Sequence, residues 1–339
     1  MIDQSQTKDV WLAGMDVGGT KIEAILVDAT GALIGQVYLP MDAQSDERAV
    51  VSIVAALRRL LDEASLPAGR LQGVGVAIPG KIHQGVVELA VNLKLRNYPL
   101  AKALADIFDI PFFLENDVRT AALGAFRYFR SQRAINSLAY LSIGTGIAAG
   151  IILDGRLYRG VNGMAGEVGH IIIDPAGPLC ACGLHGCLEA VAAGPAVAAY
   201  AEKAVRSGQE TSLRGVVPLD SRAVYQAFGA GDPVAESIVR RVSSYLGRAI
   251  HGMIMAYDVD LLVLGGGVTN ESQLFLQPIL DELRRLRLHS ELADMLVAEE
   301  KIALIPKGMN PGAWGAVVLV EQGLSLRQST PHPSAGSFV

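Results

Sequence analysis

The sequence predicts an α/β protein built from two related lobes. Two segments, residues 15–28 and 141–154, share one pattern: an apolar strand, a glycine turn, a second apolar strand and an aspartate. Such an internal repeat predicts two lobes that face one nucleotide, although two unrelated hairpins would leave the same pattern. Helix-like and strand-like stretches alternate around the repeats, and 339 residues, 50% of them hydrophobic, are enough for two domains.

The second repeat lies in an uncharged stretch, residues 137–153, whose length approaches that of a membrane span. Gly144, Gly146 and Gly150 interrupt this stretch, and each flanking run is strand-sized and rich in aliphatic residues. We therefore expect a buried hairpin here and no membrane-spanning helix.

Helical and strand signals follow one another along the rest of the chain. Residues 49–64 carry aliphatic side chains at helical spacing, and residues 72–78 form a short apolar strand that ends at Pro79 and Gly80. Both elements fit an α/β first lobe.

A long helix is predicted to begin after Asp232, because aspartate caps helices and the following Pro233 suits the first helical turn. Apolar residues then recur every four positions along one face, at Val234, Ile238, Val242, Leu246 and Ile250. Strands over 260–264 and 301–305 and a helix over 312–322 complete the predicted elements. Residues 325–339, rich in serine and proline, are predicted to be disordered.

Charge and cysteine content exclude several kinds of partner. A net charge of -5 leaves no basic surface for nucleic acid, whose binding depends on lysine and arginine that neutralise phosphates. Residues 1–9 lack the basic start and apolar run of a signal peptide, and an odd number of cysteines does not suit a secreted disulfide scaffold. We therefore expect a cytoplasmic protein with a small soluble ligand and no nucleic-acid or membrane partner.

All the cysteines of the chain follow one histidine in a single stretch. His170, Cys180, Cys182 and Cys187 offer one imidazole and three thiols, a complete tetrahedral set for Zn²⁺ that leaves no position open for water. A closed site of this kind fixes backbone and does not activate water. The alternative is that the thiols are small buried apolar groups, but the glycines and proline that bend the chain between them favour a metal.

Two glycine turns precede this stretch, and their glycines let backbone amides approach phosphate. The turns comprise Asp16, Gly18, Gly19, Thr20 and Lys21, and then Gly144, Thr145 and Gly146. Glu167 and Glu189 flank the metal set without being needed as ligands, so they are available to bind a polar molecule, the alternative being that they are surface glutamates. Phosphate turns together with a rigid polar pocket predict a phosphotransferase.

Taken together, the motifs resemble the ROK family of sugar kinases and sugar-responsive repressors, and within it the glucokinase-like, zinc-containing hexose kinases. The motifs are Asp16-x-Gly-Gly-Thr-Lys21, Glu115-Asn116-Asp117, Gly144-Thr-Gly146, Glu167-x-Gly-His170, Cys180-x-Cys-Gly-x-x-Gly-Cys-x-Glu189 and Gly265-Gly-Gly267. They span nearly the whole chain, and the zinc block is the most specific of them, since one glycine loop alone is a weak signal.

The resemblance implies an actin-like ATPase (ribonuclease H-like) fold, with two lobes and a cleft between them. A small lobe would cover residues 1–115 with the first phosphate turn, and a large lobe residues 116–300 with the zinc site and the second turn. Residues 301–324 would form a strand and helix that return to the small lobe, ahead of the tail over 325–339.

The resemblance also implies the activity: an ATP-dependent kinase, using Mg²⁺ with the nucleotide and a structural zinc, that phosphorylates the 6-hydroxyl of a hexose. Glucose is the favoured substrate, with N-acetylmannosamine, N-acetylglucosamine and fructose as alternatives, and a dimer or tetramer is expected. A non-catalytic sugar-sensing protein is a second alternative. Repressors of the family need a helix-turn-helix before the first phosphate turn, and the residues ahead of Asp16 are too few to form one.

Site residues follow from the same resemblance. The residues expected to bind the sugar are Gly80, Asn92, Asn116, Asp117, Glu167, His170 and Glu189. The adenosine is expected at Gly265, Gly266 and Gly267, unless these only form a tight turn between a strand and a helix. Asp16 would organise Mg²⁺ and phosphates, and Lys21 would add charge, although lysine at a turn is usually solvated.

Phosphoryl transfer gives these assignments a chemical reason. Because the transition state is loose, the protein mainly positions the reactants and spreads charge. A carboxylate that accepts the proton of the attacking hydroxyl contributes a factor on the order of 10² to 10⁴, and the resemblance assigns this role to Asp117. The alternative is that Asn116 and Asp117 only cap the following helix. If one nitrogen of His170 binds zinc, the other carries hydrogen and donates, and a sugar oxygen is a fitting acceptor.

Four residues depart from the usual pattern of the family. Ala148 and Ala149 stand beside the second phosphate turn where members often carry glycine, which bears on nucleotide affinity. Leu95 stands where many glucokinases have tryptophan, which weakens the case for glucose, and Ala125 replaces a frequent glutamate. None of these changes removes a predicted catalytic group.

Overall fold

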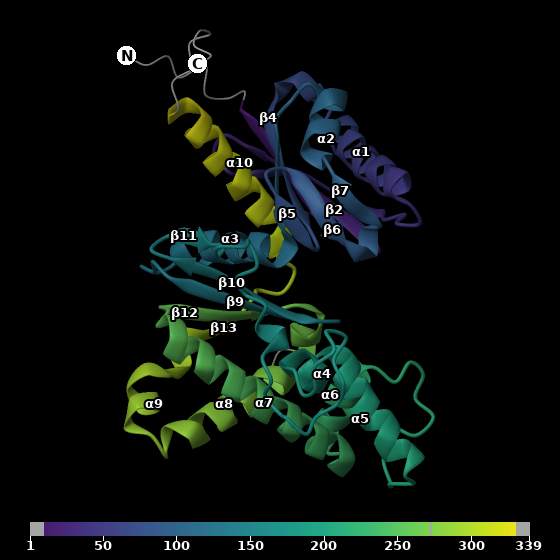
Figure 1. Cartoon of the computed structure of the whole chain (residues 1–339), viewed down its shortest axis with the longest axis vertical. Helices are drawn as coiled ribbons and strands as arrows, with labels where there is room; N and C mark the ends of the chain where they lie inside the picture. Colours follow the sequence, from purple (N-terminus) through teal and green to yellow (C-terminus); the bar gives the residue numbers. More distant parts are fainter. Residues whose placement is uncertain (1–9, 272, 330–339) are drawn as a thin grey trace. The chain divides into compact units, whose positions relative to one another are not determined.

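The computed structural model describes residues 10–271 and 273–329, which form two compact units. Within that range, unit 1 comprises residues 10–128 and 310–329, and unit 2 comprises Phe129–Met309. Each unit combines a five-stranded sheet with helices (Figure 1), which confirms the predicted α/β class. In the described part of the chain, no helix is both long and apolar enough to cross a bilayer.

The main sheet of unit 1 has the order β3-β2-β1-β4-β8. The hairpin of β1 and β2 is antiparallel, as is the β2–β3 pair, whereas β1, β4 and β8 run parallel. Its strands are β1 (Trp11–Val17), β2 (Lys21–Asp28), β3 (Leu33–Pro40), β4 (Leu71–Ile78) and β8 (Phe112–Asn116). Most residues of the parallel strands are apolar and buried because helices cover both faces of the sheet.

Helices α1 (Asp46–Glu63) and α2 (Leu100–Phe108) lie on one face of this sheet and α10 (Pro311–Ser329) lies on the other (Figure 1). Ser45 caps α1 by accepting a hydrogen bond from the Arg48 amide, and the apolar stripe of α1 is buried. A Cβ at Gly75 would overlap the Ala316 carbonyl, so glycine is what allows α10 to approach β4 so closely.

A smaller sheet follows β4 in unit 1. It has the order β5-β6-β7, with antiparallel pairs throughout. Its elements are β5 (Lys81–His83), β6 (Val86–Ala90), the 3₁₀ turn η3 (Val91–Leu93) and β7 (Leu95–Tyr98), and η2 (Ala68–Arg70) is a further short turn before β4. Helix α3 (Asp117–Arg130) begins directly after β8.

The sheet of unit 2 repeats the design of unit 1, with the order β11-β10-β9-β12-β13. Again a hairpin (β9, β10) with an antiparallel outer strand is followed by two parallel strands. The strands are β9 (Leu138–Ile143), β10 (Ile147–Leu153), β11 (Arg156–Tyr158), β12 (Leu261–Gly265) and β13 (Ile302–Leu304). The two predicted hairpins are therefore confirmed, and the repeat extends from the hairpin to the whole sheet.

Most helices of unit 2 follow β11 in the chain. They are η4 (Val168–His170), α4 (Leu188–Ala192), α5 (Gly194–Arg206), α6 (Ser221–Gly229), α7 (Pro233–Tyr257), η5 (Gly267–Glu271), α8 (Gln273–Arg287), α9 (Glu291–Leu296) and η6 (Glu299–Lys301). Asp232 caps α7 by accepting from the Val234 and Ala235 amides, as predicted. The five residues of the predicted apolar stripe are all buried in α7.

Three predicted boundaries differ from the structure. The units divide after Tyr128 and not after residue 115, because α3 packs with unit 1. The strand predicted over 301–305 does not return to the first sheet: β13 pairs with β12, and only α10 joins unit 1. Residues 325–329 of the predicted tail are helical, since α10 continues to Ser329. Residues 330–339, and residues 1–9, lie outside the described residues.

Candidate functional site

Three predicted site residues of unit 1 lie at one edge of its sheet. Asp16 is in register with Ala77 of β4, and Ile78 of β4 is in register with Asn116 of β8. Because β1, β4 and β8 are parallel, these positions are the carboxyl ends of neighbouring strands, where α/β folds bind their ligands. Gly80 joins them directly, since its carbonyl accepts a hydrogen bond of 3.1 Å from Asn116 Nδ2.

A bridged pair of acids stands at this edge. Asn310 Nδ2 donates to Asp16 Oδ2 at 2.9 Å and to Glu23 Oε2 at 2.7 Å, while Asn310 Oδ1 accepts from the Gly312 and Ala313 amides at the start of α10. Burial raises the pKa of Asp16 to about 6, and the negative charges of Asp117 and Glu23 act in the same direction, against the hydrogen bond from Asn310. A carboxylate in such surroundings favours a nearby cation.

Asn116 and Asp117 begin helix α3. Asn116 Oδ1 accepts from the Val118 and Arg119 amides, each at 3.1 Å, which is the geometry of a helix cap. Asp117 Oδ1 also accepts from the Val118 amide, at 2.9 Å. The capping alternative therefore holds for Asn116. It does not exclude a ligand role, because the Asn116 amide group faces Gly80 and the carboxylate of Asp117 is close enough to raise the pKa of Asp16.

The first glycine turn links the strands β1 and β2. The Gly18 amide donates to the Lys21 carbonyl at 2.9 Å, and the Thr20 carbonyl accepts from the Met41 amide at 2.9 Å. Thr20 and Lys21 are exposed. A Cβ at Gly19 would lie 3.3 Å from Cβ of Asn92, so η3 brings Asn92 against the turn. Unit 1 thus gathers the predicted residues from four separate segments.

The second glycine turn, residues 144–146, lies at the corresponding edge of unit 2. The Gly144 amide donates to the Gly146 carbonyl at 3.0 Å, and the Gly144 carbonyl accepts from the Gly194 amide at 2.9 Å. A pocket of about 350 Å³ opens beside it. Its lining residues are Gly144, Thr145, Gly194, Pro195, Ala198, Leu219, Asp220, Ser221, Gly267 and Val268.

The three glycines after β12 are not equivalent. A Cβ at Gly265 would overlap the ring of Tyr140, and Gly266 has a φ of +95° with the Ile143 carbonyl against it. These two positions need glycine for close packing and for the turn. Gly267 has open space where a Cβ would stand, and it alone of the three lines the pocket.

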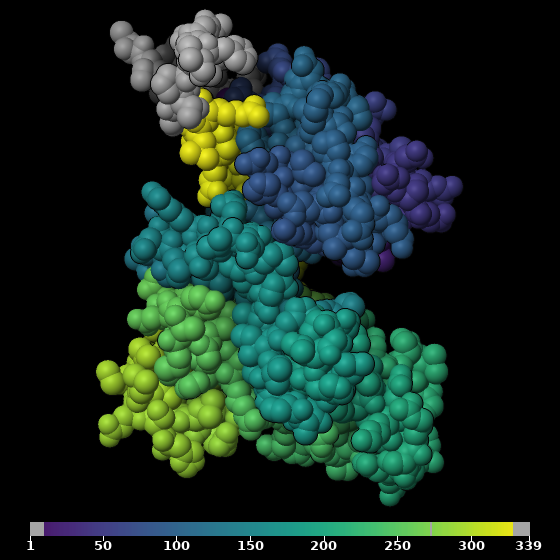
Figure 2. Space-filling view, in the orientation of Figure 1, coloured from purple at the N-terminus to yellow at the C-terminus, as the bar shows by residue number. Residues whose placement is uncertain are grey.

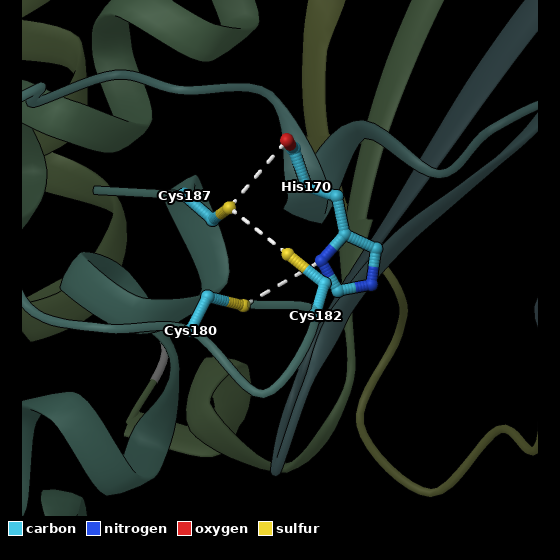
Figure 3. Close-up of side chains that lie close together, drawn as sticks. All are labelled: His170, Cys180, Cys182 and Cys187. Atoms are coloured by element: carbon cyan, nitrogen blue, oxygen red, sulfur yellow. Dashed lines mark hydrogen bonds between the residues drawn. The ribbon is translucent and has the colours of Figure 1, made fainter. Parts of the chain in front are cut away.

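The four predicted metal ligands of unit 2 converge (Figure 3). His170, Cys180, Cys182 and Cys187 offer ligand atoms that all lie within 4.8 Å of one another. Two of the separations, Cys180 Sγ to His170 Nδ1 and Cys182 Sγ to Cys187 Sγ, are each 3.6 Å. Tetrahedral ligands at zinc bond lengths stand roughly 3.5–3.8 Å apart. The set could therefore hold a zinc ion. We call these four residues the metal cluster.

The surroundings of the thiols, which shift their pKa values, also favour metal binding. Burial raises the pKa of Cys187 to about 12, whereas the backbone hydrogen bond from Leu184 lowers the pKa of the exposed Cys182. A buried thiolate is unfavourable without a cation, and a bound metal would replace the proton. The second ring nitrogen of His170 lies on the side of the ring away from the thiols (Figure 3). Metal at Nδ1 would leave that Nε2 as a hydrogen-bond donor.

Glu189 and Glu167 differ in their surroundings. Glu189 lies in the first turn of α4, and its Oε2 accepts a hydrogen bond of 2.9 Å from the Ile147 amide, at the start of β10. Glu167 precedes η4, and among residues 10–271 and 273–329 no hydrogen bond joins its carboxylate to the second glycine turn. The segment that carries the metal cluster, drawn in teal, lies on the visible surface of unit 2 (Figure 2).

Of the four positions that were expected to depart from the family pattern, Ala148 is half-buried and the other three are buried. Leu95 is 1% exposed within the core of unit 1, and Ala125 is fully buried in α3. Ala149 is also buried, and its amide donates to the Gly166 carbonyl at 2.7 Å, which ties β10 to the segment ahead of η4.

Sequence reasoning missed several residues at these edges. Glu23 is an acid within the apolar run of strand β2 and stands opposite Asp16 in the hairpin, a signal that was available. Asn310 precedes Pro311 as Asp232 precedes Pro233, so it could have been predicted as a helix cap but not as a partner of Asp16. The pocket residues of α5 and α6 carried no local signal.

The arrangement of the sheets has counterparts among solved structures. A ROK hexokinase from Thermus thermophilus is 31% identical, with a TM-score of 0.75 over 93% of this chain and 99% of that chain. A ROK glucokinase from Streptomyces griseus, solved with glucose and AMPPNP, is 29% identical, with a TM-score of 0.77 over 92% of this chain and all of that one, 100%. The fold is the actin-like ATPase fold, as expected.

Within that fold the chain belongs to the ROK family, whose model matches residues 12–323. It is 34% identical over 324 residues to a glucokinase of Halalkalibacterium halodurans, covering 93% of this chain and 96% of that protein. An N-acetylmannosamine kinase of Escherichia fergusonii is 32% identical over 258 residues, 75% of this chain and 82% of that protein. A xylose repressor of Caldicellulosiruptor bescii is 29% identical over 303 residues, 87% of this chain and 75% of that protein.

Proposed function

We propose that the protein is an ATP-dependent hexose kinase that phosphorylates the 6-hydroxyl of its sugar, with glucose as the first substrate to test. The proposal is carried by the acidic edge of unit 1, where Asp16 and Asp117 interact electrostatically at the carboxyl ends of parallel strands. It is supported by 34% identity to a glucokinase over nearly the full length of both chains. Units 1 and 2 would be the two lobes of the kinase.

Asp117 is the residue we assign as catalytic base. Its carboxylate would accept the proton of the sugar 6-hydroxyl as that oxygen bonds to the γ-phosphorus. The bond from the γ-phosphorus to the bridging oxygen breaks at the same time, and ADP leaves. Asp16, a buried carboxylate beside Asp117, is the residue that we assign to hold Mg²⁺, which would neutralise developing charge when bound with the nucleotide.

Unit 2 supplies surroundings suited to a nucleotide. The pocket beside the turn 144–146 has an apolar lining that includes Pro195, Leu219 and Val268, which fits a base and ribose. The amides of the turn and of Gly267 would face the phosphates. In the same unit, Nε2 of His170 would donate to a sugar oxygen, while Glu167 and the second oxygen of Glu189 would accept from sugar hydroxyls. Gly80, Asn92 and Asn116 are the sugar-binding residues that we assign in unit 1.

The test is ADP formation with a panel of sugars. Zinc-loaded protein with MgATP is given glucose, N-acetylmannosamine, N-acetylglucosamine and fructose in turn. We expect turnover with one of them, and a decrease in kcat on the order of 10² to 10⁴ in Asp117→Asn. Asp46→Asn is the matched control, because Asp46 is also an acid in the first turn of a helix. No ADP across the panel would refute the kinase, and equal kcat in Asp117→Asn would refute the assigned base.

A non-catalytic sugar-binding protein is the second candidate, favoured by the similarity to a xylose repressor. It predicts that calorimetry detects sugar binding in the same panel without ADP formation. Assembly as a homo-oligomer, a dimer or tetramer, is part of the proposal for either candidate and is checked by light scattering of the purified protein.

A further inference from the structure

The second glycine turn is attached to the metal cluster by one carboxylate. Glu189 Oε2 accepts the Ile147 amide at 2.9 Å, and a Cβ placed on Gly146 would lie 2.5 Å from the same oxygen. The carboxylate therefore packs against the last residue of the turn and binds the amide of the next residue. An acceptor held this close restricts how residues 144–147 can move.

Glu189 is itself held by the metal cluster. It stands two residues after Cys187, in the first turn of α4. The Leu188 amide between them donates to the Ile171 carbonyl at 2.9 Å, and Cys187 forms an isolated bridge with Ile172. Ile171 and Ile172 directly follow the ligand His170. The backbone of Cys187 and Leu188, which leads to Glu189, is thus paired with the backbone that directly follows His170.

Two further contacts join the same parts of unit 2. The Gly194 amide, just after α4, donates to the Gly144 carbonyl at 2.9 Å. The Ala149 amide of β10 donates to the Gly166 carbonyl, four residues before His170. Hydrogen bonds therefore join the turn on both sides to segments that lead to the metal cluster. Among these hydrogen bonds, only the one to Glu189 involves a side chain.

We propose that Glu189 is a positioning residue that sets the second glycine turn for nucleotide phosphate, in addition to any contact with sugar. The metal cluster fixes the backbone that carries Glu189, and the carboxylate of Glu189 in turn fixes the position of the Ile147 amide. Since the turn is assigned to the nucleotide, this inference rests on the proposed function. It predicts that loss of the carboxylate weakens nucleotide binding even when no sugar is present, which a residue that only binds sugar would not do.

The experiment compares Glu189→Ala with Glu291→Ala, a matched control because Glu291 is also an acid in the first turn of a short helix of unit 2. MgADP binding is measured by calorimetry without sugar, on variants shown by metal analysis to be zinc-loaded. A charge-assisted hydrogen bond is worth enough to change the Kd about tenfold. We expect about tenfold weaker MgADP binding in Glu189→Ala, a smaller loss in Glu189→Gln, whose amide oxygen can still accept, and no change in Glu291→Ala. Equal affinities in all variants, or equal losses at both sites, would overturn the inference.

A second measurement does not depend on the proposed function. Amide hydrogen exchange of the ligand-free protein should become roughly tenfold faster at Ile147 in Glu189→Ala, because this amide loses its acceptor. Unchanged exchange at Ile147 would overturn the inference whether or not the protein binds nucleotide. Glu189→Leu, which keeps most of the bulk of the side chain but has no oxygen acceptor, provides the same readout if the alanine variant folds poorly.

A double-mutant cycle isolates the contact. Ala at position 146 would displace the Glu189 carboxylate, so Gly146→Ala should weaken MgADP binding in the wild-type background. In the Glu189→Ala background there is no carboxylate to displace, and the additional loss should be smaller. Additive effects of the two substitutions would contradict the coupling.

Discussion

Two ion pairs of unit 1 share spacing, atoms and distance but differ in burial. Arg119 Nε lies 2.8 Å from Glu115 Oε1, with the two side chains 5% and 6% exposed. Arg59 Nε lies 2.8 Å from Glu63 Oε1, with exposures of 58% and 51%. Each pair joins residues four apart. Burial is the largest difference between the two pairs, although Glu115 Oε1 also accepts a hydrogen bond of 2.8 Å from the Asn116 amide. The comparison therefore measures mainly what burial contributes beside the predicted catalytic segment, which begins at the next residue after Glu115.

Replacement of the arginine by methionine is the perturbation in both pairs. Arginine and methionine have similar helix propensity, so that contribution is nearly the same in the two variants. Arg119→Met leaves the Glu115 carboxylate buried without the guanidinium, and breaking a buried pair in this way costs about 3–5 kcal/mol. Arg59→Met removes an exposed pair that is worth about 0.3–0.5 kcal/mol.

The assay is urea unfolding of both variants at pH 7, followed by circular dichroism. Both pairs belong to unit 1, so the same transition reports on both. We expect the free energy of unfolding to fall by about 3 kcal/mol or more in Arg119→Met and by less than about 0.5 kcal/mol in Arg59→Met. Equal losses would show that burial does not control the strength of the pair and would refute the reasoning.

Three other predictions concern unit 2 and the α10 contact. Burial would raise the pKa of Asp232, but five accepted hydrogen bonds lower it from 3.8 to about 2. The ionised Asp232 therefore stabilises the folded protein by about 2 kcal/mol above about pH 4, and this contribution is lost as the pH falls toward 2. The difference in free energy of unfolding between the wild type and Asp232→Asn should shrink in acid, and a constant difference would contradict the prediction. Cys182→Ser should lose most of its zinc and unfold at lower temperature, and metal analysis with full occupancy would count against the cluster. Gly312→Ala places a Cβ 2.8 Å from Cγ of Asp16 and should lower kcat/KM at least about tenfold. The control is Gly252→Ala, inside α7, where a Cβ would meet open space. It should leave activity unchanged and raise the free energy of unfolding by up to about 1 kcal/mol.

Local sequence signals predicted the elements that depend on neighbours in the chain. The β9–β10 hairpin followed from apolar runs broken by glycine, and the start of α7 followed from Asp232 before Pro233. The metal cluster could also be predicted from the sequence, because its four residues lie within eighteen positions, from His170 to Cys187, and their chemistry is distinctive. Elements of this kind are determined by periodicity, capping and spacing, which a short stretch of sequence contains.

Contacts between distant segments could not be predicted in this way. Asn310 and Asp16 are 294 residues apart, and nothing near either residue indicates the other. The same limit explains the wrong position of β13, because an apolar strand of three residues does not specify its sheet. The second function of Glu189, as an acceptor for Ile147, likewise depended on how α4 packs against β10.

The sequence by itself determined the α/β class, the repeated hairpins, the group of one histidine and three cysteines that could hold a metal, and the family whose motifs it resembles. The tertiary structure decided which residues meet: the acids at the carboxyl edge of unit 1, the pocket beside the second glycine turn, and the attachment of that turn to the metal cluster. The physical reason is that local conformation depends on side chains a few positions apart. A binding site depends on packing that brings together residues from opposite ends of the chain.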